Sequence, residues 1–103
     1  MSEHTFFNVI KFPEGDDTAA FQAWQNIGKF MEQQTGFIGS TLYRNIRDPK
    51  MLINKGRYET AESFMACVQN PDFIKLSEVL TELGVERVAG LYDEVESFGK
   101  GGN

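Results

Sequence analysis

The sequence has few of the residues from which many catalytic and metal sites are built. Cys67 is its only cysteine and His4 its only histidine. A single cysteine excludes a disulfide within the chain, and the two counts together argue against a cysteine-rich zinc site, a Cys-His couple or a Ser-His-Asp triad. The sequence also has no GxGxxG motif and no P-loop. We therefore expect no metal and no cofactor, and we give neither Cys67 nor His4 a role.

An excess of basic charge and long apolar runs are missing as well. Ten Lys and Arg against fifteen Asp and Glu give a net charge of -5, which disfavours binding to nucleic acid or to an anionic membrane. No stretch approaches the roughly 18 consecutive apolar residues of a membrane helix. The N-terminal MSEHTFFNVIKF has no basic segment followed by an apolar one, as a secretory signal would. We expect a cytoplasmic protein.

Strand and helix patterns alternate along the chain. Its 103 residues suit one domain with its own core. We expect this domain at residues 1–98, followed by a disordered Gly-rich tail at 99–103. Apolar alternation predicts four strands, at His4–Phe12, Phe37–Ile46, Met51–Tyr58 and Val85–Phe98. Helical spacing and capping residues predict helices at 18–34, in a short segment capped by Thr60, and from Pro71 to Leu83.

The order of these elements predicts an α+β fold. It is β-α-β-β-α-β, which right-handed crossovers bring into a ferredoxin-like arrangement with a four-stranded antiparallel sheet and helices on one face. The first and last strands have apolar residues on both faces, such as Phe6 and Val9 in the first. The helices can cover only one of these faces. We therefore expect a homodimer in which a second copy covers the other, sheet against sheet.

Four segments of the sequence resemble the antibiotic biosynthesis monooxygenase family. They are Phe21–Trp24, Gln34–Arg44, Arg57–Phe64 and Asn70–Phe73. The resemblance implies a dimeric α+β barrel. Known activities in such barrels include cofactor-free oxygenation of quinol-like or anthrone-like polyketides, autoinducer processing and haem degradation, so the fold alone does not fix the reaction.

The haem-degrading branch of the family is matched only in part. Asn8 stands where that branch has an Asn on its first strand. The positions of its Trp and of its iron-ligating His fall on Cys67 and Ser77, so the axial ligand is missing. Tyr58 stands where the family commonly has Trp, which keeps an aromatic side chain. The resemblance thus implies a small cofactor-independent monooxygenase acting on an aromatic quinol-type or anthrone-type metabolite. A non-catalytic or stress-responsive ligand-binding barrel is the alternative, and haem binding or degradation the third.

Asn8 is the catalytic candidate. It interrupts an apolar strand face between Phe6 and Ile10, and a buried amide needs hydrogen-bond partners. It can hold a substrate oxygen or O₂ beside an aromatic-lined cavity, and the resemblance places it at a family position. The alternative is a structural amide satisfied by a helix end or an ordered water.

Aromatic side chains are the substrate-binding candidates, because burial would supply most of the binding of a flat aromatic substrate. An ordinary core would use the same residues, and helical spacing favours that alternative for some of them. A buried tyrosine hydroxyl would need a partner, which favours Tyr58 as a ligand contact. The candidates are Phe21, Trp24, Tyr58, Phe64 and Phe73.

Basic residues gather in one stretch of this acidic chain. One of them could orient an anionic substrate. Complementary charge across a dimer interface is the alternative that we favour, because the last predicted strand is acidic. The basic residues are Arg44, Arg47, Lys50, Lys55 and Arg57, and the acidic ones are Glu86, Asp93, Glu94 and Glu96.

Overall fold

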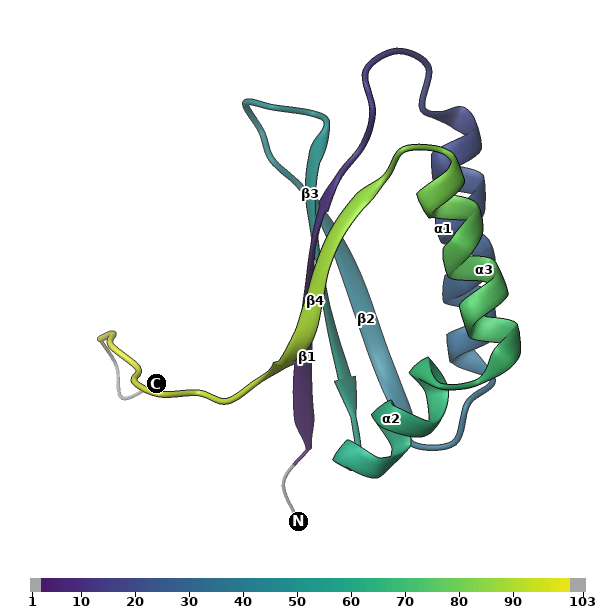
Figure 1. Ribbon diagram of the computed structural model, residues 1–103. Helices are drawn as coiled ribbons and strands as arrows, with labels where there is room; N and C mark the ends of the chain where they lie inside the picture. Colours follow the sequence, from purple (N-terminus) through teal and green to yellow (C-terminus); the bar gives the residue numbers. More distant parts are fainter. Residues whose placement is uncertain (1–2, 101–103) are drawn as a thin grey trace.

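The computed structural model describes residues 3–100, which form an antiparallel sheet with every helix on one side of it (Figure 1). The predicted α+β, ferredoxin-like order is confirmed, with the second helical region divided into two helices. Gly99 and Lys100 are the only residues of the predicted tail among those described. The elements are β1 (His4–Lys11), α1 (Thr18–Glu32), β2 (Phe37–Arg44), β3 (Met51–Tyr58), α2 (Ala61–Val68), α3 (Pro71–Glu82) and β4 (Glu86–Tyr92).

Polar side chains and one glycine define the helix boundaries. Thr60 caps α2, because its side chain accepts a hydrogen bond from the Ser63 N–H at 3.0 Å. Asn70 caps α3 in the same way, ahead of a proline at the first helical position. Gly36 has a φ of 85° just after α1, a left-handed conformation that glycine commonly adopts at the end of a helix. None of the helices within residues 3–100 is long and apolar enough to cross a bilayer.

The strands lie in the order β2-β3-β1-β4, so β1 pairs with a strand on each side. Both pairings are antiparallel, and they place Asn8 of β1 opposite Asn54 of β3 and opposite Ala89 of β4. Residues directly opposite one another on a sheet are close neighbours. The register therefore brings two asparagines, 46 residues apart in the sequence, to the same place on the helix-facing side.

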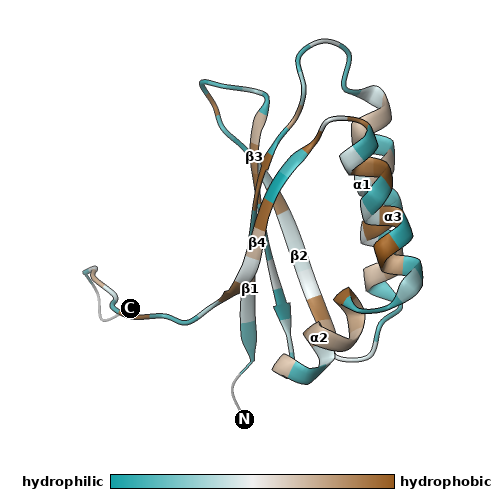
Figure 2. Ribbon diagram, viewed as in Figure 1, coloured by the Kyte–Doolittle hydropathy of each residue, from teal (hydrophilic) through white to brown (hydrophobic). Residues whose placement is uncertain are grey.

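The core lies between the sheet and the helices. Phe6 and Ile10 of β1, and Phe12 directly after it, are at most 5% exposed, which confirms the apolar face predicted for this strand. Hydrophobic residues, drawn in brown, accordingly occur along both the helices and the strands (Figure 2). Facing residues include Leu52 and Tyr58 of β3, with Ala20, Ala23, Ile27 and Met31 of α1. Burial of these side chains is the main stabilising term of the fold.

The other face of the sheet has no cover within residues 3–100. One row crosses all four strands through Tyr43, Ile53, Val9 and Val88. Their exposed fractions are 53%, 38%, 42% and 68%, values that are high for an apolar row. The prediction that the helices cover only one apolar face is confirmed.

The prediction that the last strand runs to Phe98 is wrong, because β4 ends at Tyr92. Tyr92 lies opposite Thr5, so His4 is the last residue of β1 that could face the residues that follow, and most of them have no partner on β1. Residues Asp93–Lys100 form what we call the C-terminal arm. It extends from the sheet on the side away from the helices (Figure 1). Val95 and Phe98 of the arm are 94% and 83% exposed.

The second predicted strand is also too long. It ends at Arg44 rather than Ile46 because the Asn45 side chain accepts the N–H groups of Arg47 and Asp48, which turns the chain. Ile46 is fully exposed in that turn.

Candidate functional site

A pocket of about 390 Å³ lies between the helix-facing side of the sheet and the helices. This volume is within the range of roughly 300–1,000 Å³ typical of small-molecule sites. The strands supply its floor through Phe6, Asn8, Asn54, Arg87, Ala89 and Gly90. The helices supply its roof through Trp24, Ile27, Met31, Phe64, Val68, Phe73, Ser77 and Leu80.

Two amides lie side by side on the floor. Asn54 is 3% exposed and Asn8 lies directly across from it in the sheet. The Asn8 Oδ1 atom is buried, and it has no hydrogen-bond partner among residues 3–100. A buried acceptor without a partner is costly, by roughly 1–3 kcal/mol. A ligand that donates a hydroxyl or N–H hydrogen would remove that cost.

Arg87 brings a positive charge to the same pocket. Its guanidinium donates a hydrogen bond to the Val85 carbonyl at 3.0 Å. It also donates to two acceptors on α3, the Ser77 carbonyl at 3.1 Å and Thr81 Oγ1 at 3.0 Å. None of these acceptors carries a charge, and no carboxylate within residues 3–100 forms a salt bridge with it. Burial lowers the pKa of Arg87, yet a guanidinium stays protonated at neutral pH. The pocket is therefore electrostatically suited to an anionic oxygen.

The mouth of the pocket lies at the β4 edge of the sheet. Ala89 is on the helix-facing side of β4 and lines the pocket, yet it is exposed. The rest of the lining is mainly apolar and aromatic. A ligand can thus enter beside β4 and be buried against Trp24 and Phe73.

Four of the six predicted site residues line this pocket. They are Asn8, Trp24, Phe64 and Phe73. The other two, Phe21 and Tyr58, lie outside its lining. Phe21 packs edge-on against Phe12, and the Arg44 guanidinium lies 5.1 Å from the centre of its ring.

Tyr58 is part of the core beside the pocket. It is 0% exposed and packs against the rings of Phe6, Phe37 and Phe64 at centroid distances of 5.4–5.7 Å. Burial, followed by the neighbouring Cys67 thiol, raises the pKa of its hydroxyl far above the ordinary value. Burial also raises the pKa of Cys67. A thiol that stays protonated is a poor nucleophile.

The basic stretch singled out in the sequence lies away from the pocket lining. Within that stretch, Lys50 pairs with Asp17 at 3.3 Å and Arg57 with Glu3 at 2.9 Å. The cation that does line the pocket is Arg87, which the sequence analysis did not single out, because it lies in a segment read for its acidic neighbours. Asn54 was missed as well, although it interrupts the buried face of β3 as Asn8 interrupts that of β1.

No cluster of three or more His, Cys, Asp and Glu that could hold a metal occurs within residues 3–100. Ser77, at the position of the iron ligand in the haem-degrading branch, lines the pocket. Cys67, at the position of that branch's Trp, is 1% exposed and is not part of the lining.

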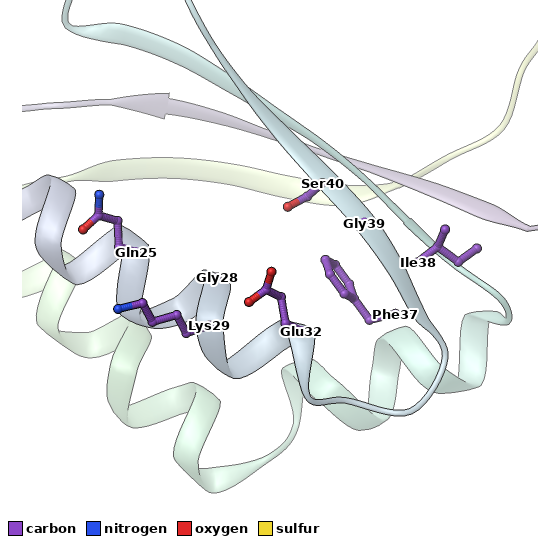
Figure 3. A pocket seen from close by; sticks show the side chains of 8 residues that line it. All are labelled: Gln25, Gly28, Lys29, Glu32, Phe37, Ile38, Gly39 and Ser40. Atoms are coloured by element: carbon purple, nitrogen blue, oxygen red, sulfur yellow. The ribbon is translucent and has the colours of Figure 1, made fainter.

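A second hollow of about 750 Å³ lies between α1 and the outer edge of β2 (Figure 3). Gln25, Gly28, Lys29 and Glu32 line it from α1, and residues 37–40 line it from β2. No polar atom along it is both buried and without a partner, a condition that Asn8 meets in the pocket. We therefore take the pocket as the candidate active site and refer to this hollow as the β2 groove.

Comparison with known sequence families gave a match over most of the chain. The sequence profile of the antibiotic biosynthesis monooxygenase family matches residues 4–79. A comparison with curated protein sequences gave no match.

Solved structures share the whole fold. SnoaB, a cofactor-independent oxygenase from Streptomyces nogalater, is 20% identical with a TM-score of 0.83, over 97% of this chain and 100% of SnoaB. A proposed monooxygenase from Shewanella loihica PV-4 is 26% identical with a TM-score of 0.74, over 93% of this chain and 97% of its own. A conserved protein from Methanosarcina mazei Go1 is 14% identical with a TM-score of 0.75, over 89% and 93%. At the identities of SnoaB and the Methanosarcina protein, the likeness is one of fold.

Proposed function

Because the chain belongs to the antibiotic biosynthesis monooxygenase family, we propose that it is a cofactor-independent monooxygenase acting in the cytoplasm on a small aromatic metabolite of the quinol or anthrone type. The observation that carries this proposal is the pocket floor. There Asn8 Oδ1 is a buried acceptor without a hydrogen-bond partner among residues 3–100. Arg87 lines the same pocket, and its guanidinium has no carboxylate partner within residues 3–100. Such a floor suits a ligand with one hydroxyl to donate and one oxygen to hold as an anion. Nucleic acid is not an expected partner of so acidic a chain.

The proposed reaction needs only the substrate and O₂. Loss of a proton from an activated ring carbon gives a carbanion, which transfers one electron to O₂. The substrate radical and superoxide then combine, and protonation gives a hydroperoxide on that carbon. Loss of water leaves a carbonyl, so one oxygen atom of O₂ enters the product and the other leaves as water.

The pocket residues would act on the first of these steps. Arg87 stabilises the oxygen over which the carbanion's charge is delocalised, and it does so more strongly inside the pocket than in water. Asn8 and Asn54 orient the substrate by hydrogen bonds to its oxygens. Trp24, Phe64 and Phe73 hold the rings and exclude water, which keeps the charge on the substrate. Phe21 and Tyr58, as parts of the neighbouring core, shape the pocket from behind in this proposal.

Oxygen uptake on a panel of quinols and anthrones tests the activity. We expect uptake with at least one of them, and with ¹⁸O₂ one labelled atom in the product. Trp24 is the only tryptophan and lines the pocket, so quenching of its fluorescence reports binding separately. Binding without uptake would favour the non-catalytic ligand-binding barrel, and neither binding nor uptake would contradict both functions.

Two variants of Arg87 test its part in the proposal. Arg87→Lys keeps the charge. Arg87→Gln removes the charge but keeps a side-chain N–H that can donate to the Ser77 carbonyl. We expect Arg87→Gln to lower kcat/KM by about tenfold or more, and to move the rise of activity with pH to higher pH because the substrate anion is less stabilised. Arg87→Lys should recover part of both. Equal profiles for the parent and Arg87→Gln would show that the charge is not used.

The proposal includes a homodimer with sheet packed against sheet. The support is the exposed row through Tyr43, Ile53, Val9 and Val88, which a second copy of the same face would cover. Light scattering after size exclusion should give a mass of twice the 11.7 kDa of one chain. A mass of one chain at micromolar concentration would contradict the dimer.

A further inference from the structure

Gly56 interrupts the row of large residues that β3 directs toward the helices. The other members of this row, Leu52, Asn54 and Tyr58, are at most 4% exposed. Gly56 is also buried, and it lies directly opposite Phe6 of β1. A Cβ atom at position 56 would overlap the Cε2 and Cζ atoms of the Phe6 ring, and a glycine inside a strand often marks such a close approach. The ring therefore lies against the backbone of β3 only because position 56 has no side chain.

The ring of Phe6 forms one wall of the pocket. The rings of Tyr58 and Phe64 pack against it at centroid distances of 5.7 and 5.5 Å, so these two neighbours leave it little room. The pocket is the open space beside the ring. A side chain at position 56 would therefore push the Phe6 ring away from β3 and into the pocket, which would shorten the pocket.

The strand register orders the pocket from a polar end to an aromatic end. Arg87 lies opposite the residue of β1 two positions after Asn8, and Phe6 lies two positions before Asn8. At about 3.4 Å per residue, the rows of Arg87 and Phe6 are about 14 Å apart. The helices follow the same order, because the Ser77 carbonyl accepts a hydrogen bond from Arg87 and the Phe64 ring packs against Phe6. The pocket therefore has a cation at one end, two amides in the middle and two aromatic rings at the other end.

We infer that Gly56 determines the length of the ring system that the pocket accepts, because it lets the Phe6 ring lie against β3. The order of the pocket also defines the substrate class. It is a linear polycyclic aromatic metabolite with oxygens on the ring at Arg87 and on the ring beside the amides, and with none on the ring at Phe6. A polar substituent on that last ring would lose its hydration among aromatic side chains and weaken binding. Gly56 acts through Phe6 and is a positioning residue. The inference rests on the proposed function, since it takes the pocket as the substrate site.

Gly56→Ala in the full-length protein tests this role with two hydroxyarenes of different length. The compounds 2-naphthol and 2-hydroxyanthracene each carry one hydroxyl on a terminal ring, and they differ by one ring. Quenching of Trp24 fluorescence gives the dissociation constant of each. We expect Gly56→Ala to raise the ratio of the constant for 2-hydroxyanthracene to that for 2-naphthol by about tenfold or more. A glycine that served only the packing of the core would lower stability without changing this ratio.

Gly39→Ala is the matched control. Gly39 is a glycine of the neighbouring strand β2 and does not line the pocket, and among the described residues nothing lies within 4 Å of a Cβ atom there. We expect this variant to keep the ratio of the parent. Urea unfolding of both variants shows whether the measured proteins are folded. An unchanged ratio in folded Gly56→Ala would overturn the inference, as would an equal change in Gly39→Ala.

The double variant Gly56→Ala/Phe6→Leu shows whether the effect passes through the Phe6 ring. Leucine lacks the Cε2 and Cζ atoms that overlap position 56, so this variant tests the inference even where Gly56→Ala alone does not fold. We expect its ratio to return to that of the parent or to fall below it. A ratio that stays above the parent's would overturn the inference. A crystal structure of Gly56→Ala should show the Phe6 ring displaced into the pocket, and a ring displaced elsewhere would overturn the inference as well.

Oxygen uptake plays no part in these measurements, so the inference and the proposed activity are judged separately. Binding with the expected length preference but without uptake on any quinol or anthrone would overturn the proposed oxygenase and leave the inference standing. Uptake by the parent with an unchanged ratio in Gly56→Ala would do the opposite. Binding of neither hydroxyarene by the parent would overturn the inference.

Discussion

At the residue scale, three polar groups in or beside the pocket differ in what surrounds them. Asn8 has an acceptor with no partner, Arg87 has three neutral acceptors, and the Tyr58 hydroxyl is buried among rings. Polar atoms left unsatisfied in a folded core are uncommon and call for a reason. A bound substrate supplies the reason for Asn8, because the atom lines the pocket. Tyr58 lies outside the lining, so a substrate in the pocket does not account for its buried hydroxyl.

We expect Asn8→Ala to reduce activity much more than stability. The Oδ1 atom has no partner to lose, so the free energy of unfolding should change by about 1 kcal/mol or less. Turnover should fall by about tenfold or more if the amide orients the substrate. Urea unfolding and oxygen uptake measure the two effects.

Asn26→Ala is the matched control for Asn8→Ala. Asn26 is exposed on α1, where its side chain accepts a hydrogen bond from Gln22 at the surface, so neither quantity should change. A loss of several kcal/mol in Asn8→Ala, or unchanged turnover in a stable variant, would make Asn8 a structural amide.

The Tyr58 hydroxyl should stay protonated in the folded protein at alkaline pH, because it is 0% exposed. Its folded pKa is raised by burial above the unfolded value of about 10. The folded state therefore holds a proton that the unfolded state releases, and stability should fall as pH rises above about 10. Urea unfolding between about pH 8 and pH 11 measures this loss, and Tyr58→Phe should flatten it. An equal alkaline loss of stability in the parent and in Tyr58→Phe would contradict the prediction.

At the element scale, alternation and capping residues predict every strand and helix, whereas strand ends depend on partners. Val95 and Phe98 continue an apolar pattern, yet they lie beyond the start of β1 at His4, so β1 offers them no residue to pair with. The candidate site likewise depends on how distant strands pair. Asn8 can be found from its own strand, but its meeting with Asn54 depends on a register that one sequence does not reveal. Arg87 reaches the pocket only because β4 lies beside β1 rather than at the other edge.

The turn between α1 and β2 gives a prediction at this scale. Gly36 has a φ of 85°, and a side chain there would overlap Ser63, whose hydroxyl bonds to the α2 cap Thr60. We expect Gly36→Ala to lower the free energy of unfolding by about 2 kcal/mol or more, from backbone strain and overlap together. Gly15→Ala separates the two causes. Gly15 has a φ of 95° with open space around it, so strain alone should cost about 1 kcal/mol. Equal losses in the two variants would show that Ser63 moves aside freely.

At the scale of the whole molecule, the covered face of the sheet holds the pocket and the uncovered face suits a second copy. The two surfaces are separate, so substrate binding and association can be altered independently. A charged variant in the exposed row, such as Val88→Asp, should lower the mass in solution and leave Trp24 quenching by a ligand intact. Variants of Asn8 should weaken Trp24 quenching by a ligand and leave the mass in solution unchanged.

The protein should neither bind haem specifically nor degrade it. We expect no saturable one-to-one Soret spectrum when haem is added, and no loss of that band with an electron donor. Ser77 lines the pocket where the iron-ligating His of the haem-degrading branch would be, and a hydroxyl is a poor axial ligand. A haem-binding protein under the same conditions is the control. A stable spectrum would overturn this expectation, and His4 would be the first ligand to replace.

The central place of β1 affects how the chain folds. Phe6 pairs with Gly56 and with Leu91, so the two loops closed by β1 span 50 and 85 residues. Long closures must form before their contacts stabilise anything, which slows folding relative to a helical domain of equal length. During that delay the first strand, with Phe6, Phe7 and Ile10, stays unpaired and prone to aggregate. The same strand that forms the floor of the pocket is therefore the segment of the nascent chain most in need of a chaperone.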